Sequence, residues 1–388
     1  MRLILIAHGL INRTGHHYME ARSFKDEAAK RGLGCTILAH RDIDLVIREE
    51  LKAQPVFRHT PYRQLFRRRY LGSLLEFLQV GRSICRELLS LPPGTITATD
   101  ILVSPLTKAR EMLGLALWLS RIPVEKRPFV AINFMIDDVT IPRRARGGRF
   151  IPIKPEVFYR FAFKRLQKRL APNRLLLSAG GAAFAHTMTQ MLKHSVQLLP
   201  LPVQHELPCS PPETFSKQPP LIVYLGHMHK RKGADLVGGI IREVLDKNPD
   251  CQFLLQANPE CWAKRWQDEI GSKGETRVQI HRGEMSQEEY QHALNRAALV
   301  LIPYLPAGYV LQTSGVFSEA MAIGKPSIIP AGTWMADMAH RVDVVKRHFI
   351  PRHEVIDISQ AVLKALANLT QLTRICVTSA ETGEKTWE

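Results

Sequence analysis

Short apolar runs recur along the whole chain and are separated by longer polar or amphipathic stretches. Runs that are apolar on both faces are typical of strands in a parallel sheet that helices cover on both sides. In the first half of the sequence they lie at Leu3–Ala7, Cys35–Ala39, Ile101–Ser104, Phe129–Met135 and Leu175–Ser178. In the second half they lie at Leu221–Leu225, Cys251–Ala257, Val278–His281, Leu299–Ile302 and Ser327–Pro330.

Helical stretches follow several of these runs. They lie at Tyr18–Arg31, Ala234–Asp246, Gln287–Ala297, Val316–Ile323 and Ile358–Leu369. Strands that alternate with helices predict an α/β fold whose parallel sheets are built from βαβ units. A length of 388 residues is enough for two such Rossmann-like domains.

A proline-rich segment separates the two sets of strands. Residues 206–220 contain five prolines, a composition typical of a linker. We therefore predict a first domain at residues 1–204, a linker at 205–220, a second domain at 221–370 and a tail at 371–388. Two outcomes stay open for the tail, which either packs back on the first domain or frays.

The positive charge is concentrated in the first predicted domain. Residues 1–204 hold 33 Lys and Arg against 15 Asp and Glu, whereas residues 205–388 hold 20 against 21. The whole formal net charge of +17 therefore comes from the first half. Such a field attracts anionic substrates, anionic lipid or nucleic acid. Because no RNA- or DNA-binding motif accompanies it, we expect no nucleic-acid partner.

The most basic segment lies between residues 143 and 174, where 11 Lys and Arg stand against one acid. A helix is expected from Pro155 onward, because Phe158, Ala162, Leu166 and Leu170 repeat every four residues. Such a helix can lie on an anionic membrane surface or bind an anionic acceptor. The alternative is a domain helix whose basic face is merely solvated. Its cationic residues are Arg160, Lys164, Arg165, Lys168 and Arg169.

The six cysteines are scattered without the spacing of metal ligands, which indicates reduced thiols in a cytoplasm. The apolar run at the N-terminus is too short for a signal peptide, and no window approaches the roughly 20 apolar residues of a membrane span. We expect a cytoplasmic protein, either free or peripheral on the inner face of the cell membrane. Neither a metal nor another cofactor is expected.

One stretch, from Pro303 to Pro326, combines a strand end, a turn of small residues and the start of a helix. Backbone N–H groups at such a place can point at an anion. The turn is Thr313-Ser314-Gly315. Glu319 lies one turn into the helix, where its carboxylate can accept hydrogen bonds from sugar hydroxyls.

Two motifs resemble those of glycosyltransferases with the two-domain GT-B fold, most closely family 4. The sequence EAMAIGKP, which starts at Glu319, is similar to the second half of the donor-site signature E-x7-E followed by A-M/L-A-x-G-x-P. Tyr309, Ser314 and Gly315 precede it as in a "Y…SG…EA" variant. The loop GHMHKRKG, from Gly226 to Gly233, is similar to G-R-L-x-x-x-K-G.

The resemblance implies roles for these residues. Glu319 would hold the donor ribose, and Lys232 would grip the donor diphosphate. His227 stands at the arginine position of the second motif, with Lys230 or Arg231 as candidates to compensate for it. Fixed cations are what this chemistry needs, because the leaving diphosphate gains negative charge as the glycosidic bond breaks.

Further candidates lie in loops after predicted strands. In similar enzymes a glycine loop after the first strand faces the donor phosphates or the acceptor, a role that falls here on Gly15. Glu284 and Met285 would contact the nucleobase through their backbone. Asp138, next to Asp137 at the end of a strand, can orient or deprotonate an acceptor hydroxyl or simply cap a helix or loop.

The resemblance implies a glycosyltransferase that moves a sugar from a UDP- or GDP-sugar to a saccharide or lipid-linked acceptor. It also implies retention of the anomeric configuration, and the basic first domain suggests polysaccharide or glycolipid synthesis at a membrane surface. The alternative is a scaffold of the same fold that has lost turnover, because Leu311 occupies the position of the first signature glutamate. Nucleic-acid binding and epimerisation have no motif that supports them.

Overall fold

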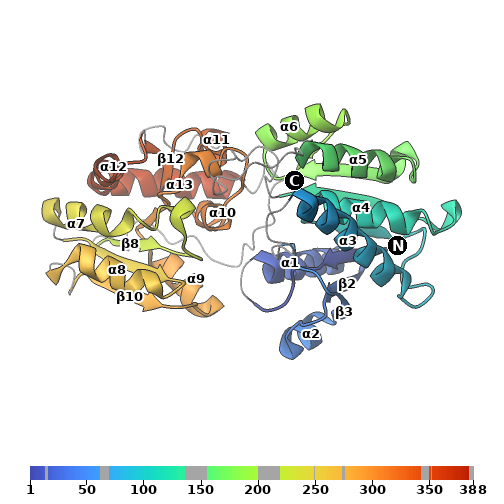
Figure 1. Ribbon diagram of the computed structural model, residues 1–388. Helices are drawn as coiled ribbons and strands as arrows, with labels where there is room; N and C mark the ends of the chain where they lie inside the picture. The colour runs from blue at the N-terminus through green and yellow to red at the C-terminus, as the bar shows by residue number, and fades with distance from the viewer. Residues whose placement is uncertain are drawn as a thin grey trace. The chain divides into compact units, whose positions relative to one another are not determined.

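The computed structural model describes residues 1–13, 16–61, 70–135, 155–199, 219–248, 250–272, 276–341, 349–350 and 352–383. The chain forms two compact units, Met1–Pro202 and Val203–Glu388. Each unit is a parallel sheet covered by helices (Figure 1). The predicted α/β fold with two Rossmann-like domains is thereby confirmed.

The sheet of the first unit has the strand order β3-β2-β1-β4-β5-β6-β7. All of its strand pairs are parallel, as the buried apolar runs predict. Its strands are β1 (Arg2–Ala7), β2 (Gly34–His40), β3 (Gln54–Phe57), β4 (Ile101–Ser104), β5 (Phe129–Phe134), β6 (Leu175–Ala179) and β7 (Gln197–Leu198).

Helices cover both faces of this sheet. Side chains of α1 and α2 share one buried core with β1 and β2. The helices α3, α4 and α5 pack side by side, with α6 next to α5 (Figure 1). The helices are α1 (His16–Lys30), α2 (Leu45–Leu51), α3 (Tyr70–Leu89), α4 (Ala109–Leu119), α5 (Pro155–Gln167) and α6 (Ala182–Leu192).

The second unit contains a parallel sheet with the order β10-β9-β8-β11-β12-β13. Its strands are β8 (Leu221–Tyr224), β9 (Gln252–Ala257), β10 (Val278–Arg282), β11 (Leu299–Leu301), β12 (Ser327–Pro330) and β13 (Phe349–Ile350). Its helices are α7 (Val237–Lys247), α8 (Cys261–Ile270), α9 (Gln287–Arg296), α10 (Gly315–Ala322), α11 (Trp334–Arg341), α12 (Val355–Ala367) and α13 (Leu369–Gly383).

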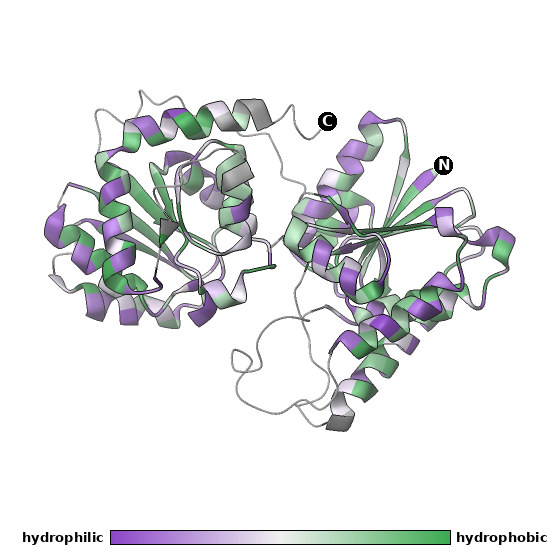
Figure 2. Ribbon diagram, turned by 90° about the horizontal axis from the view of Figure 1, so that it is seen from above, coloured by the Kyte–Doolittle hydropathy of each residue, from purple (hydrophilic) through white to green (hydrophobic). Residues whose placement is uncertain are grey.

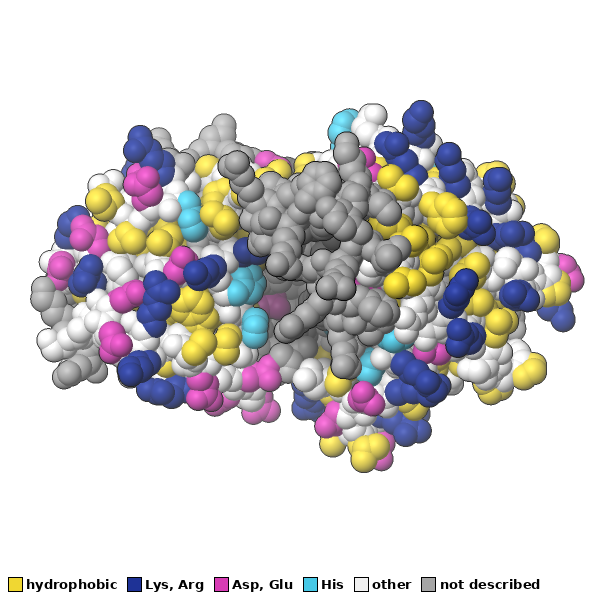
Figure 3. Space-filling model, viewed as in Figure 1, with side chains coloured by type: hydrophobic (Ala, Val, Ile, Leu, Met, Phe, Trp, Pro, Cys, Tyr) yellow, Lys and Arg dark blue, Asp and Glu magenta, His cyan; other side chains and the backbone are white. Residues whose placement is uncertain are grey.

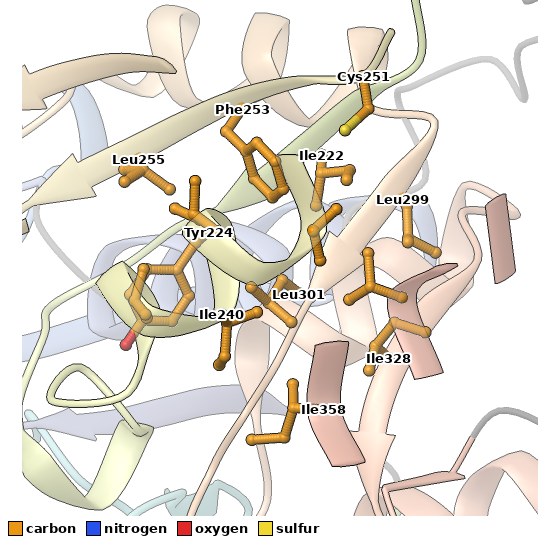
Figure 4. Close-up of a cluster of buried hydrophobic side chains, with 14 of the residues drawn as sticks. Ile222, Tyr224, Ile240, Cys251, Phe253, Leu255, Leu299, Leu301, Ile328 and Ile358 are labelled. Carbon is orange, nitrogen blue, oxygen red and sulfur yellow. The ribbon is translucent and has the colours of Figure 1, made fainter. Parts of the chain in front are cut away.

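The core of the second unit lies between the sheet and the neighbouring helices α7, α8 and α12. Figure 4 shows Ile222, Tyr224 and Phe253 of the strands pointing toward Ile240 of α7 and Ile358 of α12. In Figure 2 the strands of both units are predominantly hydrophobic, whereas the helices alternate between hydrophobic and hydrophilic residues. This burial of apolar surface is the main term that stabilises each unit.

Several elements differ from the sequence-based prediction. The helix expected from Ala234 begins at Val237, because Gly233 ends a short 3-10 turn with φ 77° and the Ala234 carbonyl accepts a hydrogen bond from Trp266. The strands β3 and β13 and the helix α8 were not anticipated. Residues 369–383 form α13, which packs against α10 and α12 of its own unit.

Candidate active site

The loop after β8 carries the basic turn that the sequence analysis singled out. It runs from Gly226, with φ 104°, through a 3-10 turn at Lys230–Lys232 to Gly233. A β-carbon at Gly233 would lie 2.0 Å from the carbonyl oxygen of Pro303. The glycine therefore lets the basic turn pack directly against the end of β11, which brings the two sequence motifs together.

Lys232 is the cation of this turn whose ammonium group lies beside Gly226 and Tyr304. Its Nζ lies 5.3 Å from the ring centre of Tyr304, and a β-carbon at Gly226 would lie 3.1 Å from the same Nζ. The side chain is half-buried. Burial lowers the pKa of Lys232, and the neighbouring Tyr309 and Glu319 oppose that shift.

The other basic residues of the turn point elsewhere. Arg231 donates hydrogen bonds to the Gly308 carbonyl at 2.9 Å and to Gln312 at 3.0 Å, and its guanidinium lies over the ring of Tyr309. Arg231 thus fastens the loop after β11 to the basic turn. Lys230 and His227 are exposed, and the His227 ring lies 6.5 Å from that of His229.

The N-terminus of α10 lies beside Gly226. Ser314 caps this helix, because its hydroxyl accepts a hydrogen bond of 3.3 Å from the N–H of Phe317. A methyl group of Val316, in the first turn, would lie 3.5 Å from a β-carbon at Gly226. The Gly226 loop, the Lys232 ammonium and the positive end of α10 therefore meet at one place, which is suited to an anion.

Glu319 lies at the edge of this place and is half-buried. Its Oε2 accepts a hydrogen bond of 2.5 Å from the phenol of Tyr290 in α9. Burial raises the pKa of Glu319, whereas the Tyr290 hydrogen bond and the charge of Lys232 lower it. The carboxylate can accept further hydrogen bonds from hydroxyl groups of a ligand.

Gln256, at the end of β9, ties together two loops at the edge of the sheet. Its buried amide accepts a hydrogen bond of 2.7 Å from the N–H of Gly226 and approaches the Gly283 carbonyl at 3.5 Å. Gly283 has φ 82° and precedes the predicted base-binding pair, of which Glu284 is exposed and Met285 is half-buried.

The structure thus brings together most of the predicted donor-binding residues. Tyr309 is 3% exposed, and its ring centre lies 4.5 Å from that of Tyr304. Thr313 is half-buried next to the capping Ser314. The predicted residues Gly15 and Asp138 lie outside the described residues, so their roles stay predictions.

Sequence reasoning missed three residues of this site: Tyr290, Gln256 and Tyr304. Tyr290 is 29 positions away from its partner Glu319, and Gln256 is 30 positions away from Gly226. No motif connects residues so far apart. A buried polar residue at the end of an apolar run, as in FLLQA at Gln256, was the available signal.

The basic helix of the first unit is present as α5, and its buried face agrees with the predicted one at Ala162 and Leu166 only. Tyr159, Ala162, Phe163 and Leu166 are buried, whereas Phe158 and Leu170 are only half-buried. The repeat of 3.6 residues explains the shift, since a strict four-residue spacing drifts around a helix. The predicted cations Arg160, Lys164, Arg165, Lys168 and Arg169 are all exposed.

No group of three His, Cys, Asp or Glu side chains in the described segments is arranged to hold a metal ion. No helix among them is both long and apolar enough to cross a bilayer.

Comparison with known proteins gave one family match. Residues 219–368 match the model of the family described as glycosyl transferases group 1. No curated protein matches the sequence of the chain.

Solved structures match over nearly the full length. HepE of Anabaena in complex with UDP and glucose is 12% identical, with 99% of this chain and 95% of that chain covered and a TM-score of 0.62. Trehalose-6-phosphate synthase OtsA is 11% identical, with 98% and 96% covered and a TM-score of 0.65. A UDP-N-acetylglucosamine 2-epimerase described as putative, from Listeria monocytogenes, is 12% identical, with 98% and 94% covered and a TM-score of 0.52.

At these identities the structural likeness establishes the fold, and the family match covers the unit that holds the site. Residues 219–368 of the second unit are thus similar to group 1 glycosyltransferases, and the chain has the GT-B fold of two Rossmann-like domains.

Proposed function

We propose that the chain transfers a sugar from a nucleotide sugar, UDP- or GDP-linked, to a hydroxyl of a saccharide or lipid-linked acceptor. The observation that carries this proposal is the meeting of Lys232, the Gly226 loop and the N-terminus of α10. A diphosphate placed there would be held by an ammonium group and by backbone N–H groups. The complex of HepE with UDP and glucose supports a donor of this class.

In this proposal Lys232 and the α10 N-terminus stabilise the charge that develops on the diphosphate as its bond to the sugar breaks. Glu319 binds the ribose hydroxyls, and the backbone at Glu284 and Met285 contacts the base. The chemistry supplied by the second unit is positioning and charge stabilisation, and it needs no protein nucleophile. Transfer with retention of configuration is part of the proposal.

A direct test compares Lys232→Ala with Lys230→Ala. Both variants lose one lysine from the same turn, but Lys230 is exposed and Lys232 lies beside Gly226. The proposal expects the first variant to lose affinity for UDP or GDP and to lose turnover, and the second to keep both. Equal effects of the two changes would contradict it.

A second candidate function is a binding protein that retains the donor site without turnover. It is favoured by Leu311, an apolar side chain that is 6% exposed at the position where the family signature has its first glutamate. This candidate shares the donor site with the first one. It predicts nucleotide binding without release of sugar from the donor, even with a panel of acceptors present.

The surface of α5 supports an anionic membrane as the place of action. Val157 and Phe161 are 55% and 42% exposed, and Lys164 and Lys168 continue their line along the helix. The guanidinium of Arg165 lies 4.5 Å from the Phe161 ring centre. Figure 3 shows Lys and Arg side chains interspersed with hydrophobic ones over this part of the first unit.

Exposed apolar side chains with cations beside them fit an anionic lipid surface, which takes up both. We accordingly include in the proposal a cytoplasmic, peripheral protein at the inner face of the cell membrane. Synthesis of a cell-surface polysaccharide or glycolipid would supply acceptors there.

A further inference from the structure

The hydrogen bond between Tyr290 and Glu319 points to a role beyond packing. We propose that Tyr290 is the positioning residue that fixes Glu319 for the ribose of the donor, and that it thereby sets the preference for ribonucleotides over deoxyribonucleotides. The inference rests on the proposed function, since it needs a nucleoside at this site. It adds a residue that the sequence motifs do not contain.

The geometry leaves one side of the carboxylate available to a ligand. The Tyr290 phenol donates to Oε2 of Glu319 at 2.5 Å, and no other hydrogen bond to this carboxylate occurs within the described part of the chain. A carboxylate has about four acceptor positions, so one oxygen can be held by the phenol while the other accepts from vicinal hydroxyls. A ribose offers two adjacent hydroxyls that match this arrangement.

Tyr290 also acts on the charge of Glu319. Burial raises the pKa of Glu319, and the Tyr290 hydrogen bond is the first of two effects that oppose this rise, before the charge of Lys232. A protonated carboxyl group would use one oxygen as a donor and would accept less well. The phenol therefore fixes the orientation of Glu319 and also favours its ionised form.

The helix that carries Tyr290 is itself firmly placed. Ser286 and Glu289 form a capping box at the start of α9, with bonds of 2.7 Å and 3.1 Å. The loop with the proposed base contacts, Glu284 and Met285, leads directly into this box. One segment of eight residues, from Gly283 to Tyr290, would thus contact the base and also position the Glu319 carboxylate that binds the ribose.

The test uses Tyr290→Phe, which removes one oxygen atom and keeps the ring. The probe is UDP or GDP, whichever binds the unaltered protein, together with its 2′-deoxy and 3′-deoxy forms, and affinity is measured by calorimetry. We expect the variant to weaken binding of the ribonucleotide roughly tenfold and that of at least one deoxy form much less. The preference for ribose over that deoxy form therefore falls.

Two further readouts separate positioning from a structural role. The double variant Tyr290→Phe with Glu319→Gln should bind no more weakly than Glu319→Gln alone, because the phenol acts through the carboxylate. In Tyr290→Phe, affinity should also start to fall at a higher pH than in the unaltered protein as the pH is lowered, because Glu319 is protonated sooner.

Tyr18→Phe is the matched control. Tyr18 also donates a hydrogen bond to a carboxylate, that of Glu50, but it lies in α1 of the first unit. This variant should leave the preference for ribose unchanged. If Tyr290→Phe leaves the preference unchanged as well, or if its effect simply adds to that of Glu319→Gln, the positioning role is overturned.

The outcomes also separate this inference from the proposed function. If the protein binds UDP or GDP, Lys232→Ala abolishes this binding and Tyr290→Phe leaves the preference for ribose unchanged, only the role of Tyr290 is rejected. Absence of binding to the unaltered protein by any nucleoside diphosphate rejects both.

Discussion

The side chain of Gln256 accepts a hydrogen bond of 2.7 Å from the backbone N–H of Gly226, and the same amide approaches the carbonyl of Gly283 at 3.5 Å. Gln256 is 4% exposed at the end of β9. It therefore fixes the loop that leads to Lys232 relative to the loop that leads to Tyr290. Two parts of the proposed donor site depend on one buried amide.

We predict that Gln256→Leu destabilises the second unit by about 1–2 kcal/mol and weakens nucleoside diphosphate binding, because the N–H of Gly226 loses its partner. Gln256→Glu is the informative comparison, since it keeps an acceptor for Gly226 but adds negative charge. We expect this variant to recover only the hydrogen bond to Gly226, since its carboxylate cannot donate to the Gly283 carbonyl, and to bind the diphosphate more poorly than Gln256→Leu does. Denaturant unfolding and calorimetry measure the two quantities, and identical behaviour of the variants would contradict this account of Gln256.

Gly233→Ala should destabilise the second unit by roughly 2 kcal/mol or more. A β-carbon there would lie 2.0 Å from the Pro303 carbonyl oxygen, and the backbone has φ 77°. Gly315→Ala is the control, because no atom lies within 4 Å of its β-carbon position. Thermal unfolding should show a clear drop for the first change and almost none for the second. Tolerance of Gly233→Ala would mean that the basic turn does not need this close approach.

Most strands could be predicted from the sequence, because a strand buried on both faces must be apolar over its whole length. The predicted bounds of β4 and β12 are the observed ones, and the predicted bounds of β1 and β8 each differ from the observed bounds by one residue. β3 was missed because it is short and contains Pro55. The start of α7 was wrong because Gly233 and the Ala234 carbonyl are engaged in tertiary contacts, which no helical pattern reveals.

The candidate site was predictable only where its residues belong to contiguous motifs. Lys232, Ser314 and Glu319 could be found, since each stands in a loop or helix start after an apolar run. The sequence left Lys230 and Arg231 open as compensation for His227, and the structure shows that Arg231 is engaged by the Gly308 carbonyl and Gln312 whereas Lys230 is exposed. Tyr290 and Gln256 reach their partners only because folding brings distant segments together, and the sequence alone does not show this.

Reversal of three charges on and just after α5, with Arg160, Lys164 and Lys168 changed to Glu, should release the protein from vesicles that contain anionic lipid. Each basic residue near such a surface contributes about 1 kcal/mol, so we expect binding to fall at least tenfold. Vesicle sedimentation at physiological salt measures the effect. Unchanged vesicle binding would show that the basic face of α5 is merely solvated and does not contact the membrane.

An apolar pair of variants tests the same surface independently of charge. Val157→Ser with Phe161→Ser should weaken vesicle binding, because both side chains are exposed between the cations of α5. Leu45→Ser with Val46→Ser is the matched control on α2, where the side chains are 68% and 62% exposed but lie next to Asp44 and Glu49. Equal losses in both pairs would point to a general effect of apolar surface.

The buried carboxyl group of Glu20 should make the stability of the first unit depend on pH. This residue of α1 is 6% exposed, and burial raises its pKa from 4.5 to about 8. Between these values the folded first unit holds a proton that the unfolded chain releases, so stability falls as the pH rises through this window. Glu20→Gln should therefore stabilise the first unit on the order of 4 kcal/mol at pH 7.5 and have little effect at pH 4.5.

Denaturant unfolding at the two pH values checks this prediction, with Glu27→Gln as the control because Glu27 is exposed on the same helix. A gain for Glu20→Gln that is the same at both pH values would show that the carboxyl group does not titrate in this range.

The most direct test of the central claim is a thermal-shift titration with UDP, GDP and their sugar conjugates. A ligand present at 100 times its dissociation constant should stabilise the native state by about 2.7 kcal/mol. We predict such a shift with one nucleotide, its loss in Lys232→Ala and its persistence in Lys230→Ala. The absence of a shift with every nucleoside diphosphate and nucleotide sugar would contradict a donor site formed by Lys232, Gly226 and the N-terminus of α10.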